Sequence, residues 1–172
     1  GLVDYSYGEF GVNPRNVDDV DLEDNNECDP NGDTNEDGSL DVLDVVQVVG
    51  GILGSIEFTD QQLCIGDVNS DSSLDVLDVV MIVGWILTPR TDDAYSSIID
   101  IDGSHINLIA NGYVGAVQLM LSHENEFTIN LTDKAFVSEY ITNGNITKLI
   151  IVAPETEHLF TTEDSFSIKE AV

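Results

Sequence analysis

Apolar residues concentrate in two stretches of the chain that are nearly identical in sequence. The unit GDTNEDGSLDVLDVVQVVGGIL at 32–53 recurs as GDVNSDSSLDVLDVVMIVGWIL at 66–87, and SLDVLDVV is common to both copies. Such a repeat indicates two copies of one structural unit. We expect the copies to be related by a pseudo-twofold axis.

Each copy runs from a polar loop into about eleven apolar-rich residues, which end near Gly54 in the first copy and near Pro89 in the second. This pattern predicts one helix after each loop, although valine is a mediocre helix former and would by propensity alone also allow a strand. The apolar positions cover more than one stripe of each helix. One face should therefore pack on the twin helix, and the other needs a second partner.

The pattern changes from about Ala94 to short segments rich in β-branched and aromatic residues. We predict strands at 98–101, 106–110, 116–121, 127–131, 149–152 and 166–168, with turns at Asn111-Gly112 and Asn143-Gly144. Six or seven strands in total indicate a small antiparallel β-sandwich. Because the segment is short for a complete sandwich, we expect an unpaired sheet edge.

The first thirty residues form a polar, acidic arm. Val3, Tyr5 and Tyr7 alternate with other residues, as in a short strand with one apolar face. Such a strand suits donation to the sheet of a neighbouring molecule. The acidic stretch 18–24 lacks the spacing of a metal loop, and we interpret it as a solvated linker.

Acidic residues dominate the charge of the chain. It has 33 Asp and Glu against 5 Lys and Arg, a formal net charge of −28. This charge excludes nucleic acid as a partner and favours cations. No apolar run approaches the roughly 18 residues that a membrane-spanning helix needs, so no membrane partner is expected.

The polar loops carry the oxygen donors of a twelve-residue calcium loop. Calcium takes ligands from loop positions 1, 3, 5, 7, 9 and 12, with the main-chain carbonyl at position 7. The first loop provides Asp33, Asn35, Asp37, Ser39, Asp41 and Asp44; the second provides Asp67, Asn69, Asp71, Ser73, Asp75 and Asp78. We therefore predict two Ca²⁺ ions with a mainly structural role, since the bare carboxylates would repel one another. The alternative is that these aspartates only cap helices and turns.

Both loops depart from the ordinary EF-hand in the same place. Position 12 is Asp instead of Glu, and position 6, where the backbone turns sharply, is Gly38 in the first loop and Ser72 in the second. A left-handed serine costs about 1 kcal/mol. We expect the second site to be the weaker one.

Other reactive residues give weaker signals. Cys28 and Cys64 precede their loops at near-equivalent positions, and we weigh a disulfide against two buried thiols. Asn130 and Asn145 begin glycosylation sequons. The three histidines are far apart and no hydrolase motif is present, so we expect no enzyme, although paired carboxylates for glycoside cleavage remain an alternative.

The doubled Asp-x-Asn-x-Asp loop, with Asp at position 12, resembles the dockerin family over residues 32–87. The resemblance implies calcium-binding F-hand loops and docking onto cohesin β-sandwiches in extracellular bacterial assemblies. It also implies partner contacts at loop positions 10 and 11, here Val42 and Leu43, and Val76 and Leu77. These apolar residues indicate a hydrophobic partner surface.

The segment GYVGAVQLMLSHENEFTINLT at 112–132 resembles cohesin-like carbohydrate-binding sandwiches and the regions that precede sorting domains in type IX-secreted bacterial proteins. We thus expect an α+β multidomain chain: an arm at 1–30, a dockerin-like module at 31–90 and a cohesin-like sandwich at 94–172.

Two functions follow from these expectations. The first is a secreted, extracellular structural protein that binds another copy of itself or a cohesin-like domain, and in the self-binding case assembles head to tail into filaments. The second is the tether of a larger secreted enzyme to a cohesin-bearing scaffold or a polysaccharide. A chain that packs its β-part against its own dockerin-like face would fit the second.

Overall fold

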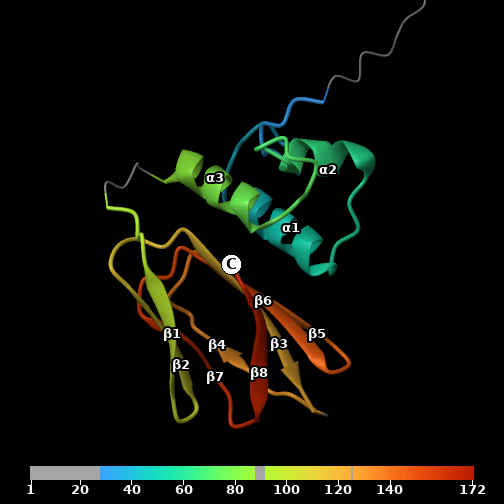
Figure 1. The fold of residues 1–172 in the computed structure, drawn as a ribbon. Helices are drawn as coiled ribbons and strands as arrows, with labels where there is room; N and C mark the ends of the chain where they lie inside the picture. The colour runs from blue at the N-terminus through green and yellow to red at the C-terminus, as the bar shows by residue number, and fades with distance from the viewer. Residues whose placement is uncertain (1–27, 88–91, 125) are drawn as a thin grey trace, which may run out of the picture.

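The computed structural model describes residues 28–87, 92–124 and 126–172. The fold is a mixture of helices and strands with strands predominating: three helices precede two antiparallel sheets of four strands each (Figure 1). The predicted strand of the arm, with Val3, Tyr5 and Tyr7, lies outside the described residues. None of the described helices is long and apolar enough to cross a membrane.

The repeat produces helices α1 (Val42–Leu53) and α3 (Val76–Ile86), as predicted. Asp41 caps the first turn of α1, and Gly54 ends the helix in the left-handed conformation with φ of 76°. Asp75 caps α3 in the same way as Asp41 caps α1. The loop thus starts each helix, as the motif requires, in spite of the many valines.

One helix was missed. Helix α2 (Asp60–Gly66) precedes the second loop, so the two copies are not joined by a simple linker. Its sequence signal is a capping box: the Thr59 side chain accepts from the Gln62 N–H, and the Gln62 side chain accepts from the Thr59 N–H. With only seven residues and few apolar ones, α2 shows no clear helical stripe.

The β-part is made of two sheets. The first has the order β1 (Ser97–Asp102), β2 (His105–Ala110), β7 (His158–Thr161), β4 (Asn130–Leu131), and the second the order β5 (Val137–Asn143), β6 (Ile146–Val152), β3 (Ala116–His123), β8 (Phe166–Ala171). The prediction of six or seven strands is therefore wrong in number: β5 and β7 were missed, and the strand expected at 127–131 is only two residues long.

The two turn predictions have different outcomes. Asn143-Gly144 lies in the tight connection of the β5–β6 hairpin, with Gly144 at φ of 59°. Asn111-Gly112, in contrast, joins β2 of one sheet to β3 of the other and forms no hairpin. The Asn111 side chain there accepts hydrogen bonds from the N–H groups of Tyr95 and Ser96.

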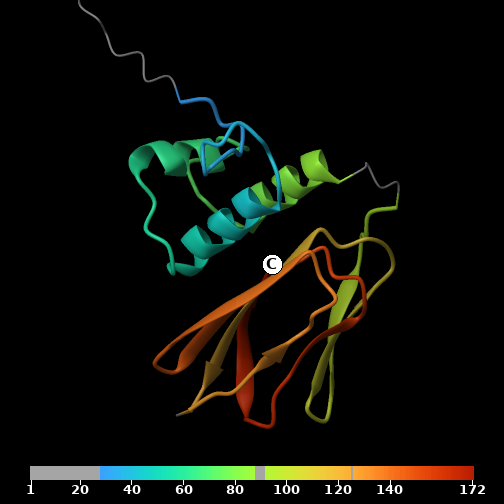
Figure 2. The same cartoon turned by 180° about the vertical axis from the view of Figure 1, so that it is seen from behind.

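Strand β6 separates two hydrophobic cores. Leu149 and Ile151 face the other sheet, whereas Ile150 and Val152 face the helices, and all four are fully buried. Both faces of this strand are therefore covered, which explains its unbroken apolar run. The helices lie over the outer face of the β5-β6-β3-β8 sheet, as the two opposite views show (Figures 1 and 2).

The core between helices and sheet supplies the second partner that the wide apolar surface of the helices needs. Val49 and Leu53 of α1 and Val79 and Val83 of α3 belong to one buried cluster with Val137, Ile150 and Val152 of the sheet. The helical part and the sandwich thus share a core.

Candidate calcium loops

The first loop folds around the side chain of Asp33 at position 1. One carboxylate oxygen accepts from the Asp37 N–H at 3.2 Å, and the other accepts from the Gly38 N–H at 2.9 Å. The Asn35 amide oxygen also accepts from the Asp37 N–H, at 2.8 Å. These bonds curl the loop back from position 6 to position 1.

Asp44 at position 12 closes the loop from the first turn of α1. Its Oδ1 accepts from the Asn35 N–H at 3.2 Å, and its Oδ2 accepts from the Asp41 N–H at 2.9 Å. The carboxylate is fully buried. One acidic side chain therefore ties the middle of the loop to the start of the helix.

The second loop repeats this network bond for bond. Asp67 accepts from Asp71 and Ser72 at 3.1 and 2.8 Å, and Asp78 accepts from Asn69 and Asp75 at 3.3 and 2.9 Å. Two loops with different intervening residues thus adopt one geometry. Their shared polar positions, and not their surroundings, set that geometry.

The sharp turn at position 6 is left-handed in both loops. Gly38 has φ of 86° and Ser72 has φ of 71°. A Cβ added at Gly38 would meet no atom within 4 Å. The difference between the loops at this position is therefore conformational preference and not crowding, and it falls on the second loop, as expected.

Burial makes the closing carboxylate of the second loop electrostatically unusual. Desolvation raises the pKa of the Asp78 carboxyl above its ordinary value, and the neighbouring Asp67 and Asp75 carboxylates act in the same direction. Hydrogen bonds from the N–H groups of Asp75 and Asn69 oppose this rise. A buried carboxylate beside two others is a site where a cation would replace repulsion by attraction.

The donor chemistry of each loop fits calcium. Carboxylate, amide and main-chain carbonyl oxygens are the hard ligands that Ca²⁺ prefers. Among the described residues, no group of three or more Asp, Glu, His or Cys side chains is placed so that it could hold a metal ion. Since an EF-hand-type loop also draws on an amide and a carbonyl oxygen, carboxylates alone do not define its site.

Capping accounts for part of the same geometry. The Asp41 side chain accepts from the backbone N–H of Asp44 while the Asp44 side chain accepts from the Asp41 N–H, which makes a capping box, and Asp41 also accepts from the Leu43 N–H at 2.8 Å. The side chains at positions 1, 3 and 5 of the first loop accept hydrogen bonds from N–H groups two to five residues further along the chain, as turn-forming residues do. The alternative that these aspartates only cap helices and turns therefore accounts for the same hydrogen bonds, and calcium binding stays a prediction.

The two cysteines are joined. A disulfide links Cys28 to Cys64 of α2, across 36 residues of sequence. The bridge encloses the first loop and α1 and anchors the start of the described chain. This pairing agrees with the near-equivalent positions of the two cysteines in the repeat.

The four expected partner residues are not equivalent in the structure. Leu43 and Leu77 are 56% and 51% exposed, and Val42 is 38% exposed. Val76 is 3% exposed, because it belongs to the core that helices and sheet share. Val76 therefore offers little surface to a partner in this arrangement of the chain, and partner contacts at the other three residues stay a prediction.

The remaining candidate residues lie in the β-part. Asn130 and Asn145 are both exposed. His105, His123 and His158 fall in strands β2, β3 and β7; the buried His123 stacks on Phe127 at a ring distance of 4.3 Å and shares a hydrogen bond of 2.9 Å with Thr147. His123 therefore acts as a packed strand residue.

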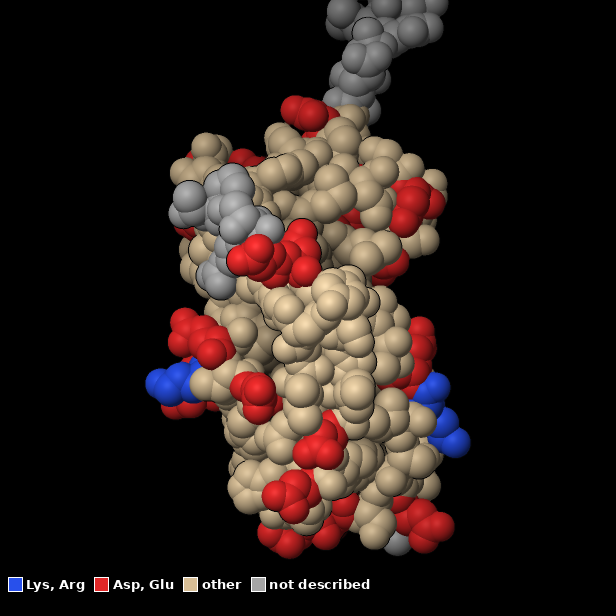
Figure 3. Space-filling view, turned by 60° about the vertical axis from the view of Figure 1, so that its left-hand side comes forward, with Lys and Arg blue, Asp and Glu red and all other residues tan. Residues whose placement is uncertain are grey.

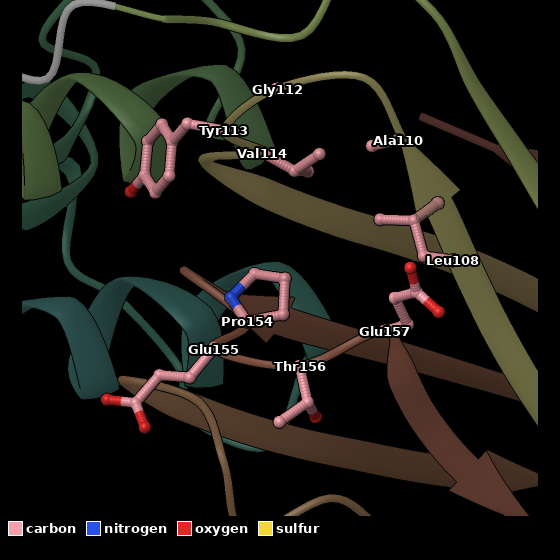
Figure 4. Close-up of a pocket in the computed structure, with 9 residues that line it drawn as sticks. All are labelled: Leu108, Ala110, Gly112, Tyr113, Val114, Pro154, Glu155, Thr156 and Glu157. Carbon is pink, nitrogen blue, oxygen red and sulfur yellow. The ribbon is translucent and has the colours of Figure 1, made fainter.

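A pocket of about 280 Å³ lies where the β2–β3 connection meets residues 154–157. Figure 4 shows that the carboxylates of Glu155 and Glu157 point away from each other. Glycoside cleavage needs two carboxyl groups that face one another across the bond. These two do not form such a pair.

No protein-family model, curated protein or solved structure matches the chain in the three comparisons, so no relative supplies a function for it.

Proposed function

We propose that this chain is a calcium-stabilised extracellular assembly protein whose helical part is a dockerin-like module. Two calcium ions would be held by the loops 33–44 and 67–78. In this proposal calcium neutralises the buried closing carboxylates and fixes the start of each helix, and it takes part in no chemical reaction.

The observation that carries the proposal is the position of two exposed leucines next to the buried closing aspartates. Leu43 directly precedes Asp44, and Leu77 directly precedes Asp78. Each leucine is at least half exposed, while each aspartate is fully buried. Calcium at the loop would therefore set the conformation of a residue that presents apolar surface to solvent.

The two copies would contribute unequally to partner binding. Val42 and Leu43 are both accessible in the first copy, whereas Val76 of the second copy is buried in the core that the helices and the sheet share. We expect the first copy to supply the larger part of the docking surface. The partner would be a second copy of this chain or a cohesin-like domain with an apolar face.

Two properties support an extracellular setting. The Cys28–Cys64 disulfide fits an oxidising compartment. The formal net charge of −28 favours a medium rich in divalent cations. A polysaccharide is a further partner to test through the β-part.

The second candidate function is the tether of a larger secreted enzyme. The observation that favours it is the packing of α1 and α3 on the sheet of the same chain, since Val79, Val83 and Ile150 share one core. Helices that pack on the sheet of their own chain have less apolar surface left for self-association. Binding to a separate scaffold would then use the leucines alone.

Electron microscopy of the purified 172-residue chain separates the two functions. We expect filaments in calcium that disperse after chelation, and no filaments for the variant Asp44→Ala/Asp78→Ala. Asp133 is exposed and lies outside both loops and outside β1, so Asp133→Ala serves as the matched control and should still assemble. Monodisperse particles in calcium and in chelator alike would leave the tether as the better explanation.

A further inference from the structure

Four strands form the edges of the two sheets in the described part of the chain: β1, β4, β5 and β8. Exposed edges pair with other strands unless something blocks them. Strand β4 has only two residues. Strand β8 carries Lys169 and a register shift opposite Met120 and Leu121, both of which discourage pairing.

The other two edges differ in their cover. Strand β5 contributes Val137 and Ile141 to the core under the helices, so α1 partly shields it. Strand β1 has six residues, of which only Ile99 is not exposed. It contains no lysine and no proline, and its pairing with β2 has no register shift. Strand β1 is the least protected of the four edges.

The inner face of the sandwich is open along β1. Ile99 and Ile101 pair with Leu108 and Ile106, which are buried between the sheets, so their side chains lie on the inner face. Ile101 is nevertheless 55% exposed. It borders a hollow of about 450 Å³ that Phe166, the first residue of β8, also lines. The rest of the lining is Gly103 and the polar residues Ser104, Thr162, Glu163, Asp164 and Ser165, which suits the hydroxyl groups of tyrosine side chains.

The outer face of β1 is apolar only at its first half. Ile98 pairs with Ile109, and these two isoleucines are 65% and 47% exposed. Figure 3 turns this side of the molecule forward: its middle is largely free of charge, with separate acidic patches and with lysines only towards the sides. Asp100 and Asp102 lie on the outer face of β1, so they leave the inner face apolar.

We infer that β1 is the docking edge for the amino-terminal arm of a second copy of this chain, with Val3, Tyr5 and Tyr7 on the inner face. A strand added to β1 needs an apolar side chain at every second position to cover Ile99, Ile101 and the hollow beside Phe166. Residues 3–7 have this alternation and nearly match β1 in length. This inference rests on the proposed assembly function and adds a second contact between copies, separate from the leucine surface of the helical part.

The position of the arm favours a second copy over the same molecule. The described chain starts at Cys28 on the helical side, far from β1 in both opposite views (Figures 1 and 2). The twenty residues 8–27 span up to roughly 70 Å when extended, so the arm is long enough to reach the β1 of a neighbouring molecule.

Complementary variants of the full chain test the contact. Tyr5→Ser/Tyr7→Ser removes the apolar face of the arm, and Ile101→Lys places a charge at the docking edge. Ile109→Lys is the matched control, because Ile109 is similarly exposed but lies on the outer face of β2. In calcium, we expect the first two variants to stay monomeric and the control to assemble, while all three keep the thermal unfolding profile of the native chain.

Mixing provides the decisive result. The arm variant has an intact edge and Ile101→Lys has an intact arm, so an equimolar mixture should give a discrete two-chain complex in sedimentation velocity and no longer species. Assembly of either variant alone at native level would overturn the inference. So would a mixture that stays monomeric.

A peptide of residues 1–12 separates this inference from the proposed function. Fluorescence anisotropy should show it binding the Tyr5→Ser/Tyr7→Ser chain. The same chain with Ile101→Lys added should bind the peptide at least about tenfold more weakly, and a scrambled peptide should not bind.

If the native chain does not assemble in calcium but the peptide still binds at Ile101, the assembly function and the second-copy assignment fail, and the docking edge stands. If the native chain assembles but the peptide does not bind, the docking edge fails and the assembly function stands.

Discussion

Val42 and Val76 occupy the same position of two nearly identical loops, yet Val42 is 38% exposed and Val76 is 3% exposed. Val76 belongs to the buried cluster that the helices and the sheet share, whereas Val42 does not. We predict that Val76→Ala lowers the free energy of unfolding by about 2 kcal/mol, from lost burial and the cavity left behind. Val42→Ala should change it by less than about 0.5 kcal/mol. Urea unfolding in excess calcium measures both; equal effects would contradict the shared core.

Calcium should stabilise the helical part through two sites. A ligand that binds only the folded state adds about 2.7 kcal/mol per site at a concentration of 100 Kd. Isothermal titration should find two calcium ions per native chain and one for Asp78→Ala, with Asp133→Ala as the control that keeps two. A stoichiometry that stays at two in Asp78→Ala would argue for ions bound elsewhere on this acidic surface.

A swap at position 6 isolates backbone strain from ligand chemistry. Ser72 has φ of 71° and Gly38 has φ of 86°, and neither side chain is among the calcium donors. Ser72→Gly should raise the unfolding free energy of the calcium-bound protein by about 1 kcal/mol, and Gly38→Ser should lower it by a similar amount. The double variant should resemble the native chain. Thermal unfolding in calcium checks the three variants side by side.

The sequence was most informative where local chemistry determines structure. The ends of α1 follow from the Asp41 cap and from Gly54, and the shape of both loops follows from acceptors at fixed spacing. The dockerin resemblance and the calcium sites themselves stay predictions. Strand β5 was missed because VSEYITN mixes polar and apolar residues on a half-covered edge, and β7 because four residues give too short a pattern.

The burial of Val76 could not be predicted from the repeat. Identical letters at 39–46 and 73–80 imply identical surroundings, whereas the true surroundings depend on where a sheet distant in sequence packs. A sign of that sheet was present in the run Leu149–Val152, which is apolar on both faces. A strand buried on both sides requires a second layer, and the surplus apolar stripe of the helices required one as well.

The disulfide should stabilise the helical part. Closing a loop of about 36 residues restricts the unfolded chain by roughly 3 to 4 kcal/mol. Cys28→Ser/Cys64→Ser should lower the unfolding free energy by about that amount in chelator. Calcium should recover part of the loss by holding the loops folded. A double variant as stable as the native chain would show that Cys28 does not constrain the fold.

Protons and calcium should compete at Asp78. Its pKa is raised in the folded protein, chiefly by desolvation, so in the absence of metal the folded state holds this proton more tightly than the unfolded state does. The contribution of Asp78 to stability in chelator is therefore greatest below its unfolded pKa of about 3.9 and is lost as pH rises towards the raised folded pKa. Asp78→Asn should remove this dependence. Urea unfolding of both proteins in chelator across an acidic pH series would reveal it: the difference between their unfolding free energies should change with pH in this window and level off below it.

In calcium the sign reverses, because ligation needs the ionised carboxylate: stability should then rise with pH over the same window in the native chain. If the native chain and Asp78→Asn show the same pH dependence in both media, Asp78 neither titrates with folding nor binds the cation.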